Sequence, residues 1–420
     1  MINIGRRRLF GLAGAGAAVA GAGALAGAGV QRAVDGDPRP VANGAPLDAP
    51  VSFHGEHQAG IVTPAQDRMH FVALDVTTDK RAELVELLRE WTDAAQRMTA
   101  GREAAENGAV GGVPQAPPRD TGEALDLPAS GLTLTVGFGG SLFDDRFGLS
   151  AARPAALRDL PRFPQDDLDP QRSGGDLCIQ ACANDPQVAV HAVRNLVRIG
   201  FGAVAVRWSQ LGFGRTSSTS RTQSTPRNLF GFKDGTNNLK AEDPSALGEH
   251  VWVQPGDGPS WMTGGTYLVA RRIRMHIEIW DRTPLAEQEA IVGRVKGSGA
   301  PLGQLDEFDT ADFHVHGAGG SPVIPEDAHI RLASAESLDG VRILRRGYNF
   351  VDGSDGQGHL DAGLFFICFA RDPHRQFVPM QHALATKDRM MEYLEHTGSA
   401  LFACPPGVQP GGHWGETLFH

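Results

Sequence analysis

Residues 228–238, NLFGFKDGTNN, have the composition of a tight loop that holds one carboxylate. Asp234 lies between two glycines and is followed by Thr236 and Asn237. Glycine, aspartate and asparagine are also the residues of ordinary turns, so a plain turn is one interpretation. In the other, the backbone holds the carboxylate on a cavity wall, where restricted hydration suits it to acid–base work. A phosphate-binding loop is excluded, because the GxxxxGK[ST] pattern is absent.

His329 is a second candidate, because arginines follow it at Arg342, Arg345 and Arg346. A lone histidine is usually structural. A histidine with guanidiniums nearby can also be an axial haem ligand, with the arginines serving anionic propionates or peroxide.

The other histidines, out of fifteen, carry weaker signals. His314 and His316 would point the same way on a strand and form a metal pair, whereas in a loop they would be a surface pair. His54 and His57 flank a glycine and are either structural or site-lining.

Apolar patterning predicts the elements that must position these residues. Strand patterns alternate with helical ones in both halves of the chain. Strand patterns lie at 70–76, 132–138, 201–208, 266–279 and 364–369. Helical patterns lie at 81–95, 186–199, 284–294 and 377–384. Strand–helix–strand order in each half predicts an α+β fold of two ferredoxin-like units that pack together.

Length and charge limit the class of protein. A chain of 420 residues is too long for one compact core, so two domains, or two repeats of one domain, are expected. Lys and Arg number 39 against 49 Asp and Glu, which gives a net charge of −10. A chain this acidic lacks the basic surface that neutralises phosphates, so a general nucleic-acid binder is excluded.

The four cysteines do not form a disulfide framework. Cys178 and Cys182 are four residues apart, which on a helix is one turn, and they serve either packing or a ligand or disulfide. CxxC and CxxCH are absent, so neither a zinc ribbon nor covalently attached c-type haem is predicted.

The N-terminus has the pattern of an export signal. Arg7 and Arg8 precede Phe10, and an Ala/Gly-rich run extends to about Val30. This predicts a twin-arginine signal peptide over 1–35 and a disordered lead-in over 36–50, with an uncleaved membrane anchor as the alternative. We therefore expect a protein exported to the periplasm, the cell envelope or the extracellular space. The twin-arginine route moves folded proteins, often with a cofactor already bound.

GFKDGTNN strongly resembles the GxxDG signature of dye-decolourising (DyP-type) haem peroxidases. Further stretches agree with that family in the same order and cover most of the chain after the signal. They are FHGEHQAGIVTP, LTVGFGGSLF, GGDLCIQACANDPQVAVHAVRNL, HIRLA and LRRGYNF. The chain is most similar to the exported twin-arginine subgroup, whose members are described as deferrochelatase/peroxidases of an iron-uptake system.

The resemblance implies a fold and a cofactor. The fold is a dimeric α+β barrel made of two ferredoxin-like domains, expected over residues 51–225 and 226–420. One haem b per chain is expected in the C-terminal domain. His329 resembles the proximal iron ligand, Asp234 the distal acid–base residue and Arg345 the distal arginine.

The resemblance also implies which residues line the haem. The family pattern commonly continues HIRLA with Asn-Pro-Arg, where this chain has Ser334, Ala335 and Glu336. This departure removes a basic contact to a propionate, for which Arg331 or Arg342 is a replacement. Asp372 is a candidate for holding the proximal imidazole. The residues expected along the cofactor are Gly235, Thr236, Asn237, Ser334, Ala335, Glu336 and Arg345.

Two activities and one alternative follow. The first is peroxidase activity, in which hydrogen peroxide is reduced with electrons from a donor. Tyr348, Trp252 and Trp261 are candidates for passing electrons to the protein surface, although aromatic residues are more often part of the core. The second is deferrochelation, the release of iron from haem with the porphyrin intact. The alternative is a non-enzymatic haem carrier or sink. Partners from an iron-uptake system and a homo-oligomer are also expected.

Overall fold

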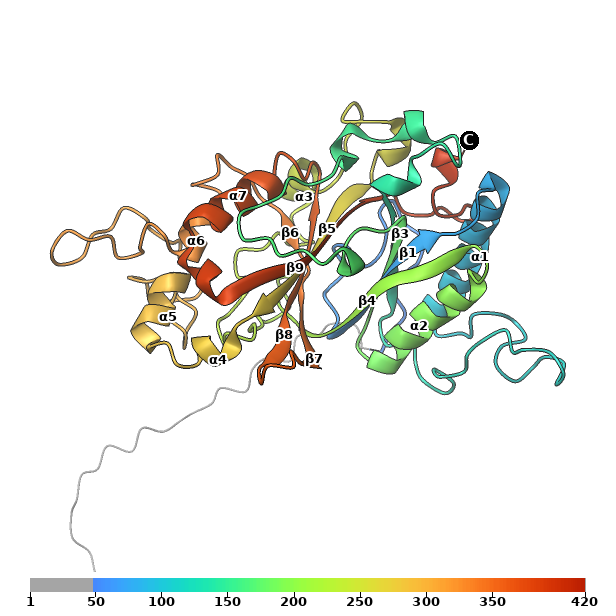
Figure 1. Cartoon of the computed structure of the whole chain (residues 1–420), viewed down its shortest axis with the longest axis horizontal. Helices are drawn as coiled ribbons and strands as arrows, with labels where there is room; N and C mark the ends of the chain where they lie inside the picture. Colours follow the sequence, from blue (N-terminus) through green and yellow to red (C-terminus); the bar gives the residue numbers. More distant parts are fainter. Residues whose placement is uncertain (1–47, 420) are drawn as a thin grey trace, which may run out of the picture. The chain divides into compact units, whose positions relative to one another are not determined.

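A computed structural model describes residues 48–419 of the chain (Figure 1). Its first half has the order βαββαβ. The elements are β1 (Arg68–Val76), α1 (Arg81–Thr99), β2 (Thr133–Gly139), β3 (Leu177–Ala183), α2 (Pro186–Ile199) and β4 (Val204–Arg215). The strands pair antiparallel in the order β4-β1-β3-β2. This order is that of a ferredoxin-like unit.

The second half repeats the arrangement. After α3 (Pro244–His250) come β5 (Thr266–Met275), α4 (Ile277–Trp280), α5 (Leu285–Val292), α6 (His329–Leu332), β6 (Leu344–Arg345), β7 (Tyr348–Ser354), β8 (Leu360–Ala370), α7 (Phe377–Lys387) and β9 (Leu394–Cys404). The order across the sheet is β9-β5-β8-β7, and β6 extends β7 along β8. The strand order therefore matches that of the first half.

The two half-sheets join edge to edge and close a barrel. Strand β4 pairs with β7 at Phe213 and Asn349, and β2 pairs with β9 at Phe138 and Ala403. Closure gives each edge strand a partner and so removes exposed edges. The predicted barrel of two ferredoxin-like units is confirmed.

Alternation along the strands separates the barrel interior from its outer layer. In β1, Phe71 belongs to an apolar cluster with residues from both halves, such as Phe365 and Phe402, which fills the interior. Val72 and Leu74 belong instead to the cluster that includes α1 and α2. The helices therefore cover the outside of the first half-sheet (Figure 1).

Local signals explain where the helices begin. The Asp185 carboxylate accepts hydrogen bonds from the backbone N–H groups of Gln187 and Val188, and Pro186 occupies the first helical position of α2. The strand expected over 266–279 ends earlier, because β5 stops at Met275 and α4 follows.

The helical interpretation of the Cys178–Cys182 spacing is wrong, because both residues lie on β3. With a strand period of two, both thiols point into the barrel, where Cys404 of β9 also lies. All four cysteines are free and buried, and burial raises the pKa of the Cys178 thiol far above its ordinary value. Packing is their role in this structure.

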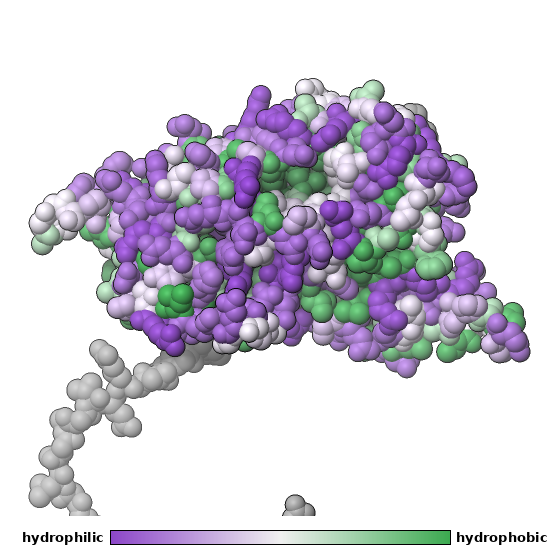
Figure 2. Space-filling model, in the orientation of Figure 1, coloured by the Kyte–Doolittle hydropathy of each residue, from purple (hydrophilic) through white to green (hydrophobic). Residues whose placement is uncertain are grey.

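Some expectations about organisation stay predictions. The signal peptide and residues 36–47 of the lead-in lie outside the described residues. The expected boundary at 225/226 falls in the segment between β4 and β5. Among residues 48–419, no helix has both the length and the apolar character needed to span a bilayer. The face in Figure 2 is mostly hydrophilic, with apolar residues in small separate groups.

Candidate active site

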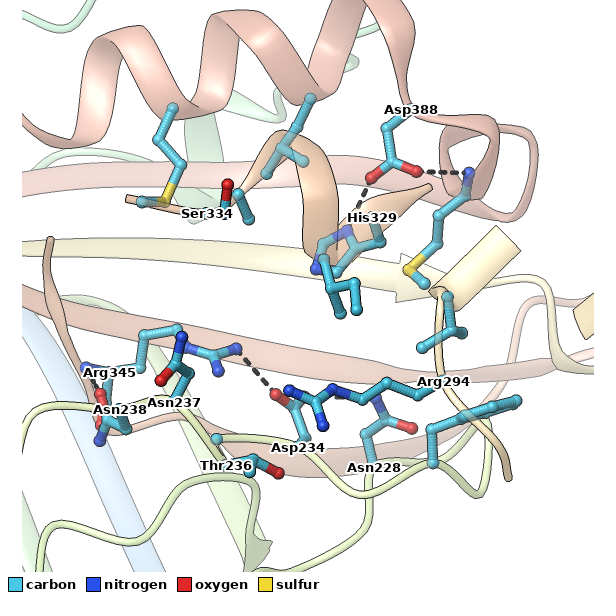
Figure 3. Close-up of a pocket in the computed structure, with 18 of the residues that line it drawn as sticks. Asn228, Asp234, Thr236, Asn237, Asn238, Arg294, His329, Ser334, Arg345 and Asp388 are labelled. Carbon is cyan, nitrogen blue, oxygen red and sulfur yellow. Dashed lines mark hydrogen bonds and ion pairs between the residues drawn. The ribbon is translucent and has the colours of Figure 1, made fainter. Parts of the chain in front are cut away.

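A cavity of about 470 Å³ lies in the second half of the barrel, against the face of β5, β8 and β9 that is turned away from the interior. Ile273, Leu364 and Phe366 of these strands line it. Helices α6 and α7 form one wall, and the loop around Asp234 forms the opposite wall (Figure 3). The cavity therefore has apolar sides and polar groups on two facing walls.

Asp234 is held rigidly on its wall. Its backbone N–H donates to the Pro226 carbonyl at 2.9 Å, and Asn228 Nδ2 donates to its Oδ2 at 3.2 Å. Gly235 has φ +82°, and a Cβ there would lie 2.8 Å from Ser217 Cα, so only glycine fits. The loop is thus a turn that also presents a carboxylate to a cavity, and the two interpretations made from the sequence are compatible.

Arg345 reaches the same carboxylate from β6. Its Nη1 lies 2.7 Å from Asp234 Oδ1. Asn238 fixes this strand to the loop, because its Oδ1 accepts from the Arg345 N–H and its Nδ2 donates to the Arg345 carbonyl, both at 2.8 Å. Asn238 was not identified from the sequence, although it directly follows the loop residues that were.

Glu307 ties a further loop to the Asp234 segment. Its carboxylate forms an ion pair with Lys233 and accepts from Thr236 Oγ1 at 3.1 Å. Burial alone would raise the pKa of Glu307, but Lys233 and the hydroxyl donors lower it overall. Arg294 donates to the Glu307 carbonyl at 3.1 Å, and its guanidinium lies beside Asp234 (Figure 3). Neither Glu307 nor Arg294 carries a recognisable local signal in the sequence.

His329 faces this cluster from the opposite wall (Figure 3). Its Nδ1 is hydrogen-bonded to Asp388 Oδ2 at 2.6 Å, and the other Asp388 oxygen accepts from the Met390 N–H at 2.8 Å. Burial lowers the pKa of His329, but the buried Asp388 carboxylate outweighs this effect and raises it overall. Within residues 48–419, Nε2 has no hydrogen-bond partner and remains free for a ligand in the cavity.

The expectation that Asp372 holds this imidazole is wrong. Asp372 accepts from the His374 N–H at 2.9 Å and forms an ion pair with Arg375, just before α7. Asp388 directly follows the other end of α7. The eleven-residue helix separates the two carboxylates, and only its packing beside α6 decides which one meets His329.

The structure places the remaining predicted cofactor residues on the same cavity. Arg342 also lines it, whereas Arg331 turns away, donates to the Ile324 carbonyl at 3.1 Å and lies over the Phe313 ring. The expected residues that line the cavity are Gly235, Thr236, Asn237, Ser334, Ala335, Glu336, His329 and Arg345.

The other histidines serve different contacts. His314 is exposed and forms an ion pair with Glu336 at 3.1 Å, and His316 Nδ1 bonds to the His314 carbonyl. Across residues 48–419 no group of three or more metal-ligating side chains occurs. His54 Nδ1 contacts the Val408 carbonyl, and His57 Nδ1 donates to the Gly264 carbonyl at 2.7 Å. His57 lines a separate cavity.

The aromatic residues considered for surface electron exit are all buried. Tyr348 is fully inaccessible, and Trp261 and Trp252 are 4% and 7% exposed. Trp252 stacks on His57 with ring centroids 3.7 Å apart. None of the three offers a surface on which a bulky donor could dock, so surface electron exit through them is contradicted and the alternative, that they are core residues, is confirmed.

Comparison with known proteins places this geometry in a family. The models of the N-terminal and C-terminal parts of Dyp-type peroxidases match residues 58–214 and 225–409. The deferrochelatase of Yersinia pestis is 39% identical over 367 residues, which cover 86% of this chain and 83% of that protein. The deferrochelatase of Escherichia coli K12 is 40% identical over 363 residues, covering 85% and 84%.

A solved structure agrees with this result. The oxyferrous complex of DtpA from Streptomyces lividans superimposes with a TM-score of 0.82 at 39% identity, over 90% of this chain and all of that one. The chain therefore belongs to the Dyp-type peroxidase family. Within it, the curated relatives described above carry the name deferrochelatase.

Proposed function

We propose that this protein is a haem b peroxidase that holds one haem in the cavity between His329 and Asp234. The observation that carries the proposal is the pairing of Asp234 with Arg345 on the wall opposite an imidazole whose Nε2 is free. The cavity fits the group, because its sides are apolar and the free Nε2 of His329 is a suitable iron ligand. Asp388 fixes the tautomer of that ligand and increases its basicity.

Haem, when bound, would supply the two electrons that reduce hydrogen peroxide, and an electron donor would then replace them. The residues of this chain handle the protons and the charge. Asp234 is placed to take a proton from one peroxide oxygen and return it to the other as the O–O bond breaks. The Arg345 guanidinium, fixed by Asn238, stabilises the negative charge that develops. Arg342, which also lines the cavity, would replace the missing basic residue towards a propionate.

Replacing Asp388 by asparagine tests the assignment of the proximal partner. The asparagine would keep the size of the side chain but lose the charge that holds the His329 N–H, so we expect haem to dissociate about 10–100 times faster. Haem transfer to excess apomyoglobin measures the rate. Asp372→Asn is the matched control and leaves the rate unchanged. Equal rates in wild type and Asp388→Asn would contradict the role of Asp388.

A second activity is proposed from the relatives named deferrochelatase. In this reaction haem is the substrate, iron leaves the macrocycle and two protons take its place on the pyrrole nitrogens. Incubating the protein with haem, a reductant and an iron chelator should yield fluorescent protoporphyrin and chelated ferrous iron in equal amounts. Recovery of unchanged haem would refute this activity. Haem binding with neither iron release nor peroxide turnover would leave the carrier or sink as the function.

We further propose export by the twin-arginine route to the periplasm or cell envelope, on the pattern of residues 1–35. There an electron donor would reduce the protein during peroxidase turnover. Iron released from haem would pass to an uptake system. A homo-oligomer remains part of the proposal. Fractionation of cells with the natural leader and with Arg7 and Arg8 replaced by lysine tests the export route.

A further inference from the structure

The cavity wall contains a buried histidine that the roles above do not use. His396 of β9 pairs with Ile273 of β5 and lines the cavity, and it is only 2% exposed. Its Nδ1 has no hydrogen-bond partner among the described residues. Buried polar atoms in native proteins nearly always have a partner, so this nitrogen requires an explanation.

The surroundings of His396 keep it neutral. Burial, together with the nearby Arg271 cation, lowers its pKa to about 3. The carboxylate close to Arg271 is that of Asp166, and it is already committed to a fully buried ion pair with that arginine. His396 is thus a neutral imidazole.

One neighbour defines which nitrogen carries the proton. Gln381 of α7 is also buried and lines the cavity, and its Nε2 lies 3.5 Å from His396 Nε2. An amide N–H can only donate, so Nε2 is the accepting nitrogen and Nδ1 carries the hydrogen. The pair therefore presents an unsatisfied N–H donor in a wall otherwise formed by apolar side chains such as Leu364 and Phe366.

The chemistry of the cofactor identifies the partner. The periphery of haem b carries methyl and vinyl groups, which do not accept hydrogen bonds, and two propionate carboxylates, which do. We propose that His396, oriented by Gln381, donates a hydrogen bond to one haem propionate. This inference rests on the proposed haem function. A neutral N–H donor to a carboxylate forms a charge-assisted bond without adding a buried charge to the wall.

The chain provides a matched control on the other side of the barrel. His70 of β1 is half-buried, its Nδ1 also lacks a partner in the described part of the chain, and burial lowers its pKa to about 4. It does not line the haem cavity. Replacing His70 by phenylalanine makes the same chemical change without touching the proposed ligand.

The test removes the two interacting groups separately. The full chain, as wild type, His396→Phe and His70→Phe, is loaded with iron protoporphyrin IX or with its dimethyl ester, which lacks the carboxylates. Transfer of each to excess apomyoglobin gives the dissociation rate. We expect His396→Phe to speed loss of the free acid about tenfold. Loss of the diester, whose uncharged ester oxygens are weaker acceptors, should change by no more than about threefold. His70→Phe should change neither rate.

His396→Asn keeps an N–H donor and should retain most of the slow dissociation of the free acid. If His396→Phe fails to fold, His396→Asn still tests the proposal. Equal effects of the His396 variants on the free acid and the diester, or no effect on either, would overturn the propionate contact while leaving haem binding intact. Failure of the wild type to bind either compound would overturn the haem function itself.

Discussion

Asp234→Asn is expected to lower kcat/KM for hydrogen peroxide about a thousandfold, the middle of the range for losing a positioned acid–base group. Asparagine fills the same space and still meets Arg345, but it cannot take and return a proton. The loss should therefore appear in turnover while haem loading stays normal. Stopped-flow absorbance after mixing the loaded protein with peroxide measures it.

The control for this prediction is a carboxylate on the same cavity. Asp309 lines the cavity, but its carboxylate accepts only from the Leu305 and Asp306 N–H groups of its own turn. Asp309→Asn should leave peroxide turnover within about twofold, as expected for a site without a catalytic role. Full activity in Asp234→Asn would remove Asp234 from the acid–base role.

The Asp234–Arg345 contact leads to a second prediction for peroxide turnover. Because the two side chains touch at 2.7 Å, their effects on turnover should not add. Arg345→Leu removes the cation that stabilises developing negative charge and is expected to cost about a hundredfold or more. The double variant should lose less than the product of the two single losses. Strict multiplication would show that the residues act independently.

His329→Ala is expected to abolish tight haem binding. The substitution removes the only imidazole that the described residues place with a free nitrogen opposite Asp234. We expect loss of the Soret band of the purified protein and its partial return on adding free imidazole, which can occupy the space left by the side chain. Absorption spectra with and without imidazole measure both.

His382→Ala provides the comparison for that experiment. His382 lies on α7, close to the same wall, but it does not line the cavity. Its replacement should leave the spectrum unchanged. A normal Soret band in His329→Ala that does not respond to imidazole would mean that another residue binds the iron.

The fold class and three of the proposed site residues could be predicted from the sequence. Alternating strand patterns in both halves predicted two ferredoxin-like units, because a period of two depends only on neighbouring residues. The resemblance of GFKDGTNN and HIRLA to the family pattern pointed to Asp234 and His329. The positive φ of Gly235 is a local backbone demand that the first motif already contains. Arg345 followed from the LRRGYNF motif, which lies far from Asp234 in the chain.

The contacts made by these residues could be seen only in the folded protein. Asp388, not Asp372, meets His329, because α7 carries one carboxylate to α6 and leaves the other at its far end. Asn238 could be assigned as the clamp on Arg345 only once β6 lay beside the loop. The inward-facing cysteines and the buried His396 depend likewise on strand register. Which strands and helices pack together depends on contacts between residues distant in the chain, and local patterns predict the elements better than their packing.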